Sequence, residues 1–264
     1  ISPSNFTVIK AGDFDNFHYD NLDGQAVSAI FGDRQIFDLK LSYYLNNPNN
    51  QNALSQITLP PETPNQQVHY HLLDPLPESI KVDADGNFIA TYEVPANNSV
   101  KVELLAQVLL TLQADPHIQT PPALPAHLLP QKYWETDNPQ LQEAASGLTS
   151  VSDINQFVVD TLDYTEKSLD GEFYRLGAAN SFLPENRNLA TCQEFTDLFV
   201  TLARIKQIPA KRIVGYAYSN NEELRPISVV GDVLHAWPAF YNQVTNSWQE
   251  IDPTWQETTG GIDY

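Results

Sequence analysis

The chain contains a single cysteine, Cys192, and this residue is followed by His235 and Asp252. A thiol, an imidazole and a carboxylate are the three groups that a cysteine acyl-transfer site requires. The thiol attacks a carbonyl carbon, the imidazole moves the proton, and the carboxylate orients the imidazole. We therefore take Cys192 as the candidate nucleophile, His235 as the candidate general base and acid, and Asp252 as the candidate orienting group.

The residues around Cys192 predict the beginning of a helix. Residues 191–206 place apolar side chains at three- and four-residue steps, and Pro209 follows shortly after the expected end. Unpaired N–H groups and the helix dipole at such a start favour the thiolate form of a cysteine. The alternative is that Cys192 is a small buried hydrophobic residue, which is the more common role of a free cysteine.

His235 and Asp252 are expected near each other because they flank what reads as a hairpin of strands at 233–241 and 248–251. If the loop has an even length, position 241 faces position 248. His235 then lies opposite Thr254, with Asp252 within diagonal reach on the same face. A slip of one residue would send the two side chains to opposite faces. The alternative is a strand histidine with a satisfied hydrogen bond beside an Asp-Pro turn.

The first half of the chain reads as an antiparallel β-sandwich over residues 1–115. Short runs rich in β-branched and aromatic residues alternate with Asn, Pro and Gly, and Asp85-Gly86 is a strong hairpin signal. Several strands at this spacing are typical of a sandwich. The expected strands cover residues 26–31, 36–45, 68–73, 79–82, 88–94 and 100–112.

The second half changes character after a proline-rich connector at 116–130, which we expect to separate two domains. Helical periodicity begins beyond it, at 138–148 and 152–162, with Ser152-Asp153 as the expected N-cap of the second helix. Strands are expected at 212–218 and in the hairpin described above. The predicted fold class is therefore α+β, with a sandwich followed by a mixed domain at 131–264.

Composition limits the classes of partner and chemistry. The net charge of −19 would repel phosphate backbones, so we expect no nucleic-acid partner. One cysteine excludes an intrachain disulfide and a multi-thiolate metal site, and the expected chemistry needs no cofactor. No apolar run is long enough to span a membrane. The chain starts at Ile1 without a Met, so we take it as an excised piece or mature form, with any anchor or export signal outside it.

Residues 133–264 resemble the transglutaminase-like superfamily, whose core is shared in outline with papain-type proteases. The resemblance implies that Cys192 is the nucleophile, His235 the general base and acid, and Asp252 the orienting carboxylate. It also implies an α+β core that normally runs past residue 264, so strands are expected to be missing at the end. The matching blocks are Cys192 with Phe195 and residues 198–203, the sequence IPAKRIVGY at 208–216, His235-Ala236-Trp237, and Asp252-Pro253-Thr254-Trp255.

One departure from the family pattern concerns the residue before the nucleophile, where Thr191 stands in place of the usual Gly. A side chain there could narrow or obstruct the substrate cleft, whose walls we expect to include Trp237, Tyr216 and Trp255. The first half resembles β domains that precede this core in bacterial surface proteins, which favours the cell envelope or the extracellular space.

The expected function is cysteine-dependent acyl transfer on protein or peptide substrates. Hydrolysis, as in a protease or amidase, is favoured over transfer to a lysine amine, because nothing in the chain marks an amine site. The alternative from another class is an inactive interaction or scaffold module that keeps the fold, and Thr191 is the best support for it.

Overall fold

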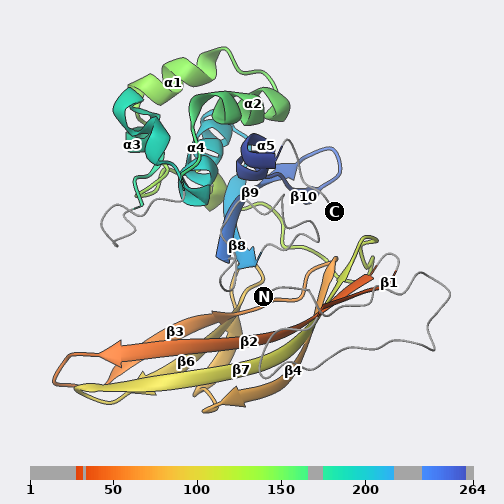
Figure 1. Ribbon diagram of the computed structural model, residues 1–264, viewed down its shortest axis with the longest axis vertical. Coiled ribbons are helices and arrows are strands. Elements are labelled where there is room, and N and C mark those ends of the chain that lie inside the picture. Colours follow the sequence, from red (N-terminus) through yellow and green to blue (C-terminus); the bar gives the residue numbers. More distant parts are fainter. Residues whose placement is uncertain (1–27, 32–33, 166–174, 217–233, 260–264) are drawn as a thin grey trace. The chain divides into compact units, whose positions relative to one another are not determined.

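The computed structural model describes residues 28–31, 34–165, 175–216 and 234–259 (Figure 1). The chain divides into two compact units, Ile1–Pro121 and Pro122–Tyr264. Each unit has its own cluster of buried apolar side chains. Together they give the mixed α+β class that the sequence predicts. Among the described residues, no helix is both long and apolar enough to cross a membrane.

The first unit contains two antiparallel sheets that share one core. A four-stranded sheet has the order β1-β2-β7-β4, and a three-stranded sheet has the order β3-β6-β5. The core draws on both sheets, since buried residues of β2, β4 and β7 cluster with those of β3 and β6. The strands are β1 (Ser28–Phe31), β2 (Arg34–Asn47), β3 (Ala53–Leu59), β4 (Gln66–Asp74), β5 (Ser79–Val82), β6 (Phe88–Val94) and β7 (Asn98–Thr111).

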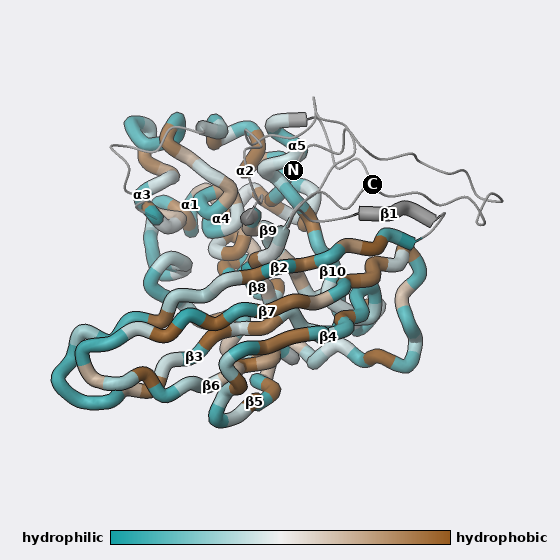
Figure 2. Tube along the Cα trace, turned by 60° about the horizontal axis from the view of Figure 1, so that its bottom comes forward, coloured by the Kyte–Doolittle hydropathy of each residue, from teal (hydrophilic) through white to brown (hydrophobic). Residues whose placement is uncertain are grey.

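Alternation of apolar and polar residues explains why these segments form strands with one buried face. In β7, Val102, Leu104 and Ala106 are buried, whereas the residues between them are less so. Figure 2 shows the resulting alternation of colour along β2, β7 and β4. Such a pattern stabilises a sheet only when its apolar face is covered, and the second sheet covers it here.

The hairpin predicted at Asp85-Gly86 is confirmed. Gly86 has φ of 89°, a value that costs a glycine little, and β5 pairs with β6 on either side of the turn. The side chain of Asp83 accepts hydrogen bonds from the backbone N–H groups of Asp85 and Asn87 at 2.9 and 2.8 Å. One strand, β3, was not predicted from the sequence, because its exposed Leu54 and its less exposed Ser55 break the alternation of apolar and polar residues.

The second unit packs helices against a three-stranded antiparallel sheet with the order β10-β9-β8. Its central helix contacts both β8 and β9, and helices α1, α2, α3 and α5 each contact that helix (Figure 1). The bounds are α1 (Pro139–Ser146), α2 (Val151–Thr161), α3 (Ala178–Phe182), α4 (Cys192–Ile205), β8 (Ala210–Tyr216), β9 (Leu234–Asn242), β10 (Ser247–Glu250) and α5 (Pro253–Thr259), with 3₁₀ turns at Pro125–Leu128 and Pro184–Leu189.

Two local expectations in this unit were wrong. The N-cap of α2 is Ser150 rather than Ser152, because Asp153 at the third helical position closes a capping box with Ser150. The segment after Asp252 is the helix α5, so the strand register that was expected to place Thr254 opposite His235 does not extend that far. Positions 26, 27, 217, 218 and 233 of the expected strands lie outside the described residues.

Candidate active site

Cys192 is the first residue of α4, and a capping box holds this helix start in place. Thr191 is the N-cap, and its hydroxyl accepts a hydrogen bond from the N–H of Gln193 at 3.3 Å. The carboxylate of Glu194 accepts bonds from the N–H and the hydroxyl of Thr191 at 3.0 and 2.7 Å. Glu194 is itself buried and also accepts from the N–H of Leu176. The side chain of Thr191 is therefore used to fix the first turn that carries the thiol.

His235 and Asp252 form a buried hydrogen-bonded pair. The Nε2 atom of His235 lies 2.6 Å from Oδ2 of Asp252, and the two residues are 1% and 8% exposed. His235 lies near the beginning of β9, where the backbone pairs it with Gly215 of β8. The imidazole is thus placed by the sheet and held in orientation by a carboxylate.

Asp252 reaches His235 by a route that the sequence analysis did not predict. The even register is correct, since Tyr241 pairs with Trp248, but β10 ends at Glu250, so His235 has no strand partner at Thr254. Instead, the Oδ1 atom of Asp252 accepts the N–H of Trp255 at 3.0 Å and caps α5. One carboxylate oxygen therefore binds the helix start and the other binds the imidazole.

The charge state of His235 follows from these contacts. Burial by itself lowers the pKa of His235, but the hydrogen bond to Asp252 and the charges of Asp252 and Cys192 outweigh it and raise the pKa to about 9. Because Nε2 is bound by Asp252, Nδ1 is the nitrogen that can face Cys192. This Nδ1 atom is buried and makes no hydrogen bond of regular geometry with any described residue. At neutral pH the ring is expected to carry a proton beside the thiol, whose side chain is half-buried.

Thr196 connects the helix that carries Cys192 to the strand that carries His235. Its hydroxyl lies 2.7 Å from the carbonyl oxygen of Cys192 and 3.0 Å from the carbonyl oxygen of Ala236. The residue is fully buried. A single hydroxyl proton shared between two carbonyls holds α4 and β9 together one turn below the thiol.

Aromatic residues enclose the imidazole. The ring of Trp237 stacks on His235 with centroids 5.7 Å apart, and the buried Trp255 lies 6.0 Å away on α5. The indole N–H of Trp237 donates to Glu250 at 2.7 Å. Gly215 makes room for this indole, because a Cβ there would lie 2.8 Å from its Cη2 atom.

The third aromatic candidate, Tyr216, does not pack against His235 as Trp237 and Trp255 do. It is 46% exposed at the end of β8, and strand alternation points it away from the face that Gly215 shares with His235. Two of the three predicted cleft residues therefore contact the histidine, and Tyr216 does not lie with them.

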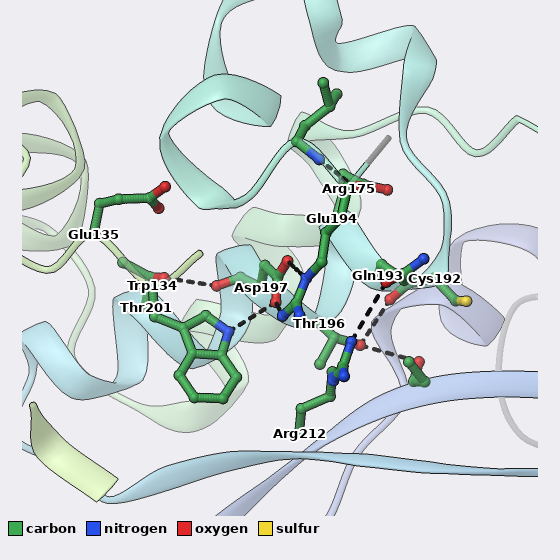
Figure 3. Close-up of polar contacts among 12 residues, drawn as sticks. Trp134, Glu135, Arg175, Cys192, Gln193, Glu194, Thr196, Asp197, Thr201 and Arg212 are labelled. Carbon is green, nitrogen blue, oxygen red and sulfur yellow. Dashed lines mark hydrogen bonds and ion pairs between the residues drawn. The ribbon is translucent and has the colours of Figure 1, made fainter. Parts of the chain in front are cut away.

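A second polar cluster, made of Trp134, Arg175 and Asp197, lies behind the first turns of α4 (Figure 3). Trp134 Nε1 and Arg175 Nε each donate to the fully buried Asp197 at 2.7 Å. Arg175 also packs over the ring of Tyr133 at 4.1 Å. These partners are distant in sequence and carry no motif, so the sequence analysis missed them. The capping box, in contrast, is readable as the string Thr-Cys-Gln-Glu at 191–194.

In the part of the chain that the structure describes, no group of three or more His, Cys, Asp or Glu side chains could hold a metal ion. His69 and His71, which lie in the first unit, make an edge-to-face ring pair at 4.8 Å.

Comparison with known proteins finds relatives of the second unit's core. Residues 135–253 match the family described as the transglutaminase-like superfamily. The solved structure of a candidate cysteine protease from Cytophaga hutchinsonii aligns with a TM-score of 0.55 at 17% identity, covering 88% of this chain and 78% of that one. The periplasmic domain of TgpA from Pseudomonas aeruginosa aligns with a TM-score of 0.44 at 14% identity, covering 89% of this chain and 77% of that one. No curated protein sequence matches the chain.

The matched segment contains α4, the three-stranded sheet and Asp252, so it covers the three candidate catalytic residues. Residues 135–253 form a core of the transglutaminase-like superfamily. The alignment with the Cytophaga structure shows a common fold and, at that identity, supports nothing further. The family supports a cysteine-dependent acyl-transfer chemistry in general terms.

Proposed function

We propose that the protein is a cysteine acyl-transfer enzyme in which Cys192, His235 and Asp252 form the catalytic triad. The observation that carries the proposal is the buried bond between His235 and Asp252 beside a thiol at a helix start. An imidazole with a pKa of about 9 keeps its proton at neutral pH. A proton on the ring favours the thiolate of its neighbour, since the two charges attract.

In this mechanism the thiolate of Cys192 attacks the carbonyl carbon of an amide in a protein or peptide. The oxyanion that forms lies near the backbone N–H of Cys192, which has no helical acceptor at this position. His235 gives its proton to the departing amine nitrogen as the C–N bond breaks, which leaves a thioester on Cys192. Asp252 stays ionised and keeps the ring in place.

Release of the acyl group requires a second nucleophile. Water loses a proton to His235 and attacks the thioester, the C–S bond breaks, and a carboxylic acid leaves while the thiolate is restored. Hydrolysis is our choice because no feature of the described residues marks a site for an amine. An added amine could take the acyl group by the same steps and give an amide.

The rival view was that Thr191 blocks the cleft and leaves a scaffold. Its hydroxyl is held by Glu194 and by the N–H of Gln193, so the side chain has a structural role in the capping box. A threonine at position 191 is therefore explained by the capping box and need not block the cleft. This weakens the argument that the domain is an inactive scaffold.

The experiment uses p-nitrophenyl acetate, a small activated ester that needs no specific binding site. The wild-type protein should release nitrophenolate in a burst and carry an acetyl group on Cys192, detected by mass spectrometry of the peptide. Cys192→Ala should show neither signal, and His235→Ala should acylate far more slowly. Added methylamine tests whether the acyl group goes to an amine or to water. If the folded wild-type protein carries no acetyl group on Cys192, the proposed function is wrong and the scaffold alternative is favoured.

A further inference from the structure

Arg212 of β8 extends toward the first turn of α4, next to the candidate nucleophile (Figure 3). Its guanidinium donates to the side-chain oxygen of Gln193 at 3.4 Å, and Gln193 directly follows Cys192. The guanidinium is close enough to Cys192 for the two charges to interact. The residue is half-buried, so part of this cation has left bulk water.

Among the residues that the structure describes, the charge of Arg212 is compensated only in part. Burial lowers the pKa of Arg212, and the neighbouring cation of Arg175 lowers it further, whereas Asp197 and Cys192 act against this. Asp197 is already bound by Arg175 through two nitrogen atoms and by Trp134. Among the described residues, no carboxylate forms an ion pair with Arg212.

A carboxylate is the ligand that best fits a half-buried guanidinium. The planar set of donors on the guanidinium fits a carboxylate through two parallel hydrogen bonds, and partial burial strengthens such a pair. The protein as a whole is strongly acidic, with a net charge of −19, and its general field repels anions. Any preference for an anionic substrate must therefore come from local cations such as Arg212.

We propose that Arg212 is a specificity residue that binds a carboxylate of the substrate beside the carbonyl attacked by Cys192. This inference rests on the proposed function, because it assumes that substrates reach Cys192. The carboxylate can belong to an acidic side chain or to the free C-terminus of a peptide. Both present the same chemistry to the guanidinium.

The first test compares two alkylating reagents of similar size, anionic iodoacetate and neutral iodoacetamide, on the only thiol of the chain. The ratio of their rate constants isolates the effect of charge on the reagent, because both react with the same thiolate. We expect Arg212→Gln to lower the iodoacetate-to-iodoacetamide ratio by roughly fivefold, as loss of a nearby partly screened charge does. Arg212→Lys keeps the charge and should retain most of the ratio.

The matched control is Lys211→Gln, which removes the same charge one residue earlier on β8. Alternation points Lys211 to the other face of the strand, where its amine lies 4.4 Å from the ring of Trp248. The ratio should stay unchanged in this variant. An equal fall of the rate ratio in Arg212→Gln and Lys211→Gln would show that only the net charge of the protein matters, which contradicts the inference. No fall of the ratio in Arg212→Gln would also overturn it. If Arg212→Gln does not fold, the wild type is compared at low and high salt: screening of a local cation should lower the ratio, and a ratio that stays level or rises overturns the inference.

The second test distinguishes the two sources of carboxylate. Peptides with Glu or Gln next to the scissile amide, each with a free or amidated C-terminus, are compared by kcat/KM. Faster turnover of the Glu peptides than of the Gln peptides identifies a side-chain carboxylate as the ligand of Arg212. Faster turnover of the peptides with a free C-terminus identifies the terminal carboxylate. Either preference should be lost in Arg212→Gln. Turnover of all four peptides at equal rates contradicts this inference but leaves the proposed function intact, whereas no acylation of Cys192 at all contradicts the proposed function.

Discussion

The two units of the molecule bury different kinds of side chain. In the first unit, Asn47 is the only polar residue among the buried side chains that the structure describes. Its amide links the end of β2 to the end of β6 by donating to the carbonyls of Val94 and Pro95 at 2.9 and 3.1 Å. The second unit buries a far larger polar set, namely His127, Asn155, Ser181, Glu194, Thr196, Asp197, Thr201, Arg204, His235, Asp252 and Thr254.

This difference supports placing the proposed chemistry in the second unit. A buried polar group costs about 1–3 kcal/mol when it lacks a hydrogen-bond partner, so a fold that needs only stability avoids such groups. The sandwich core can be explained by apolar packing alone. In the second unit, Glu194, Thr196 and Asp252 bind the helix starts and strands next to Cys192, which means that much of the polar burial holds the site together.

The largest expected effect comes from the three candidate catalytic residues. Cys192→Ala should reduce turnover to background, and His235→Ala should lower it by about 10⁴-fold or more, because proton transfer is lost with the ring. Asp252→Asn keeps an oxygen for the cap of α5 and should retain at least about tenfold more activity than His235→Ala. Full activity in Asp252→Asn would remove Asp252 from the mechanism. Turnover is measured against the same ester or peptide for all variants.

The next largest expected effect is a loss of stability in the first unit. Leu104→Ala removes a fully buried side chain from the sandwich core and should lower the free energy of unfolding by about 2–5 kcal/mol. The rate at which iodoacetamide labels Cys192 should not change below the unfolding transition. Denaturant unfolding followed by circular dichroism gives the first quantity, and mass spectrometry gives the second. Slower labelling in the folded variant would show that the sandwich contributes to the site.

A smaller effect is expected for Thr196, and Thr201 supplies a matched control. Both residues are fully buried on α4 and both hydroxyls donate to the carbonyl four residues earlier at 2.7 Å. Only Thr196 also contacts the carbonyl of Ala236 on β9. Thr196→Val and Thr201→Val should therefore lose similar stability, about 1 kcal/mol, but only Thr196→Val should lower kcat, by roughly tenfold. Equal kcat values would mean that the link to β9 does not position the site.

The smallest effect is predicted for a cut in the connector. Residues 116–124 hold three prolines and precede the 3₁₀ turn at Pro125–Leu128, whose His127 is buried, so limited proteolysis should cleave between 116 and 124 first. The C-terminal piece should stay folded and label at Cys192 at the rate of the intact chain. If the purified piece unfolds, the two halves depend on each other and the domain boundary is wrong.

Local sequence patterns predicted most helices and strands, but they did not predict the contacts between residues distant in sequence. The start of α4 at Cys192 and the pairing of Tyr241 with Trp248 follow from periodicity and loop length, and both were predicted. Helix α5 was missed although Asp252 followed by Pro253 is a good N-cap with proline at the first helical position. The bonds of Asp197 to Trp134 and Arg175 span 63 and 22 residues, a separation at which spacing carries no signal.

The most direct test of the account is the rate of iodoacetamide labelling of Cys192 as a function of pH, in the wild type and in His235→Ala. The pKa of about 9 for His235 lies above its ordinary 6.5, so the ring keeps its proton through neutral pH and loses it only as the pH rises past about 9. The wild type should therefore label rapidly already at pH 6–7, and His235→Ala should label appreciably only near pH 8.5, as an ordinary thiol does. Two superimposable profiles that both rise near pH 8.5 would contradict the claim that His235 activates Cys192.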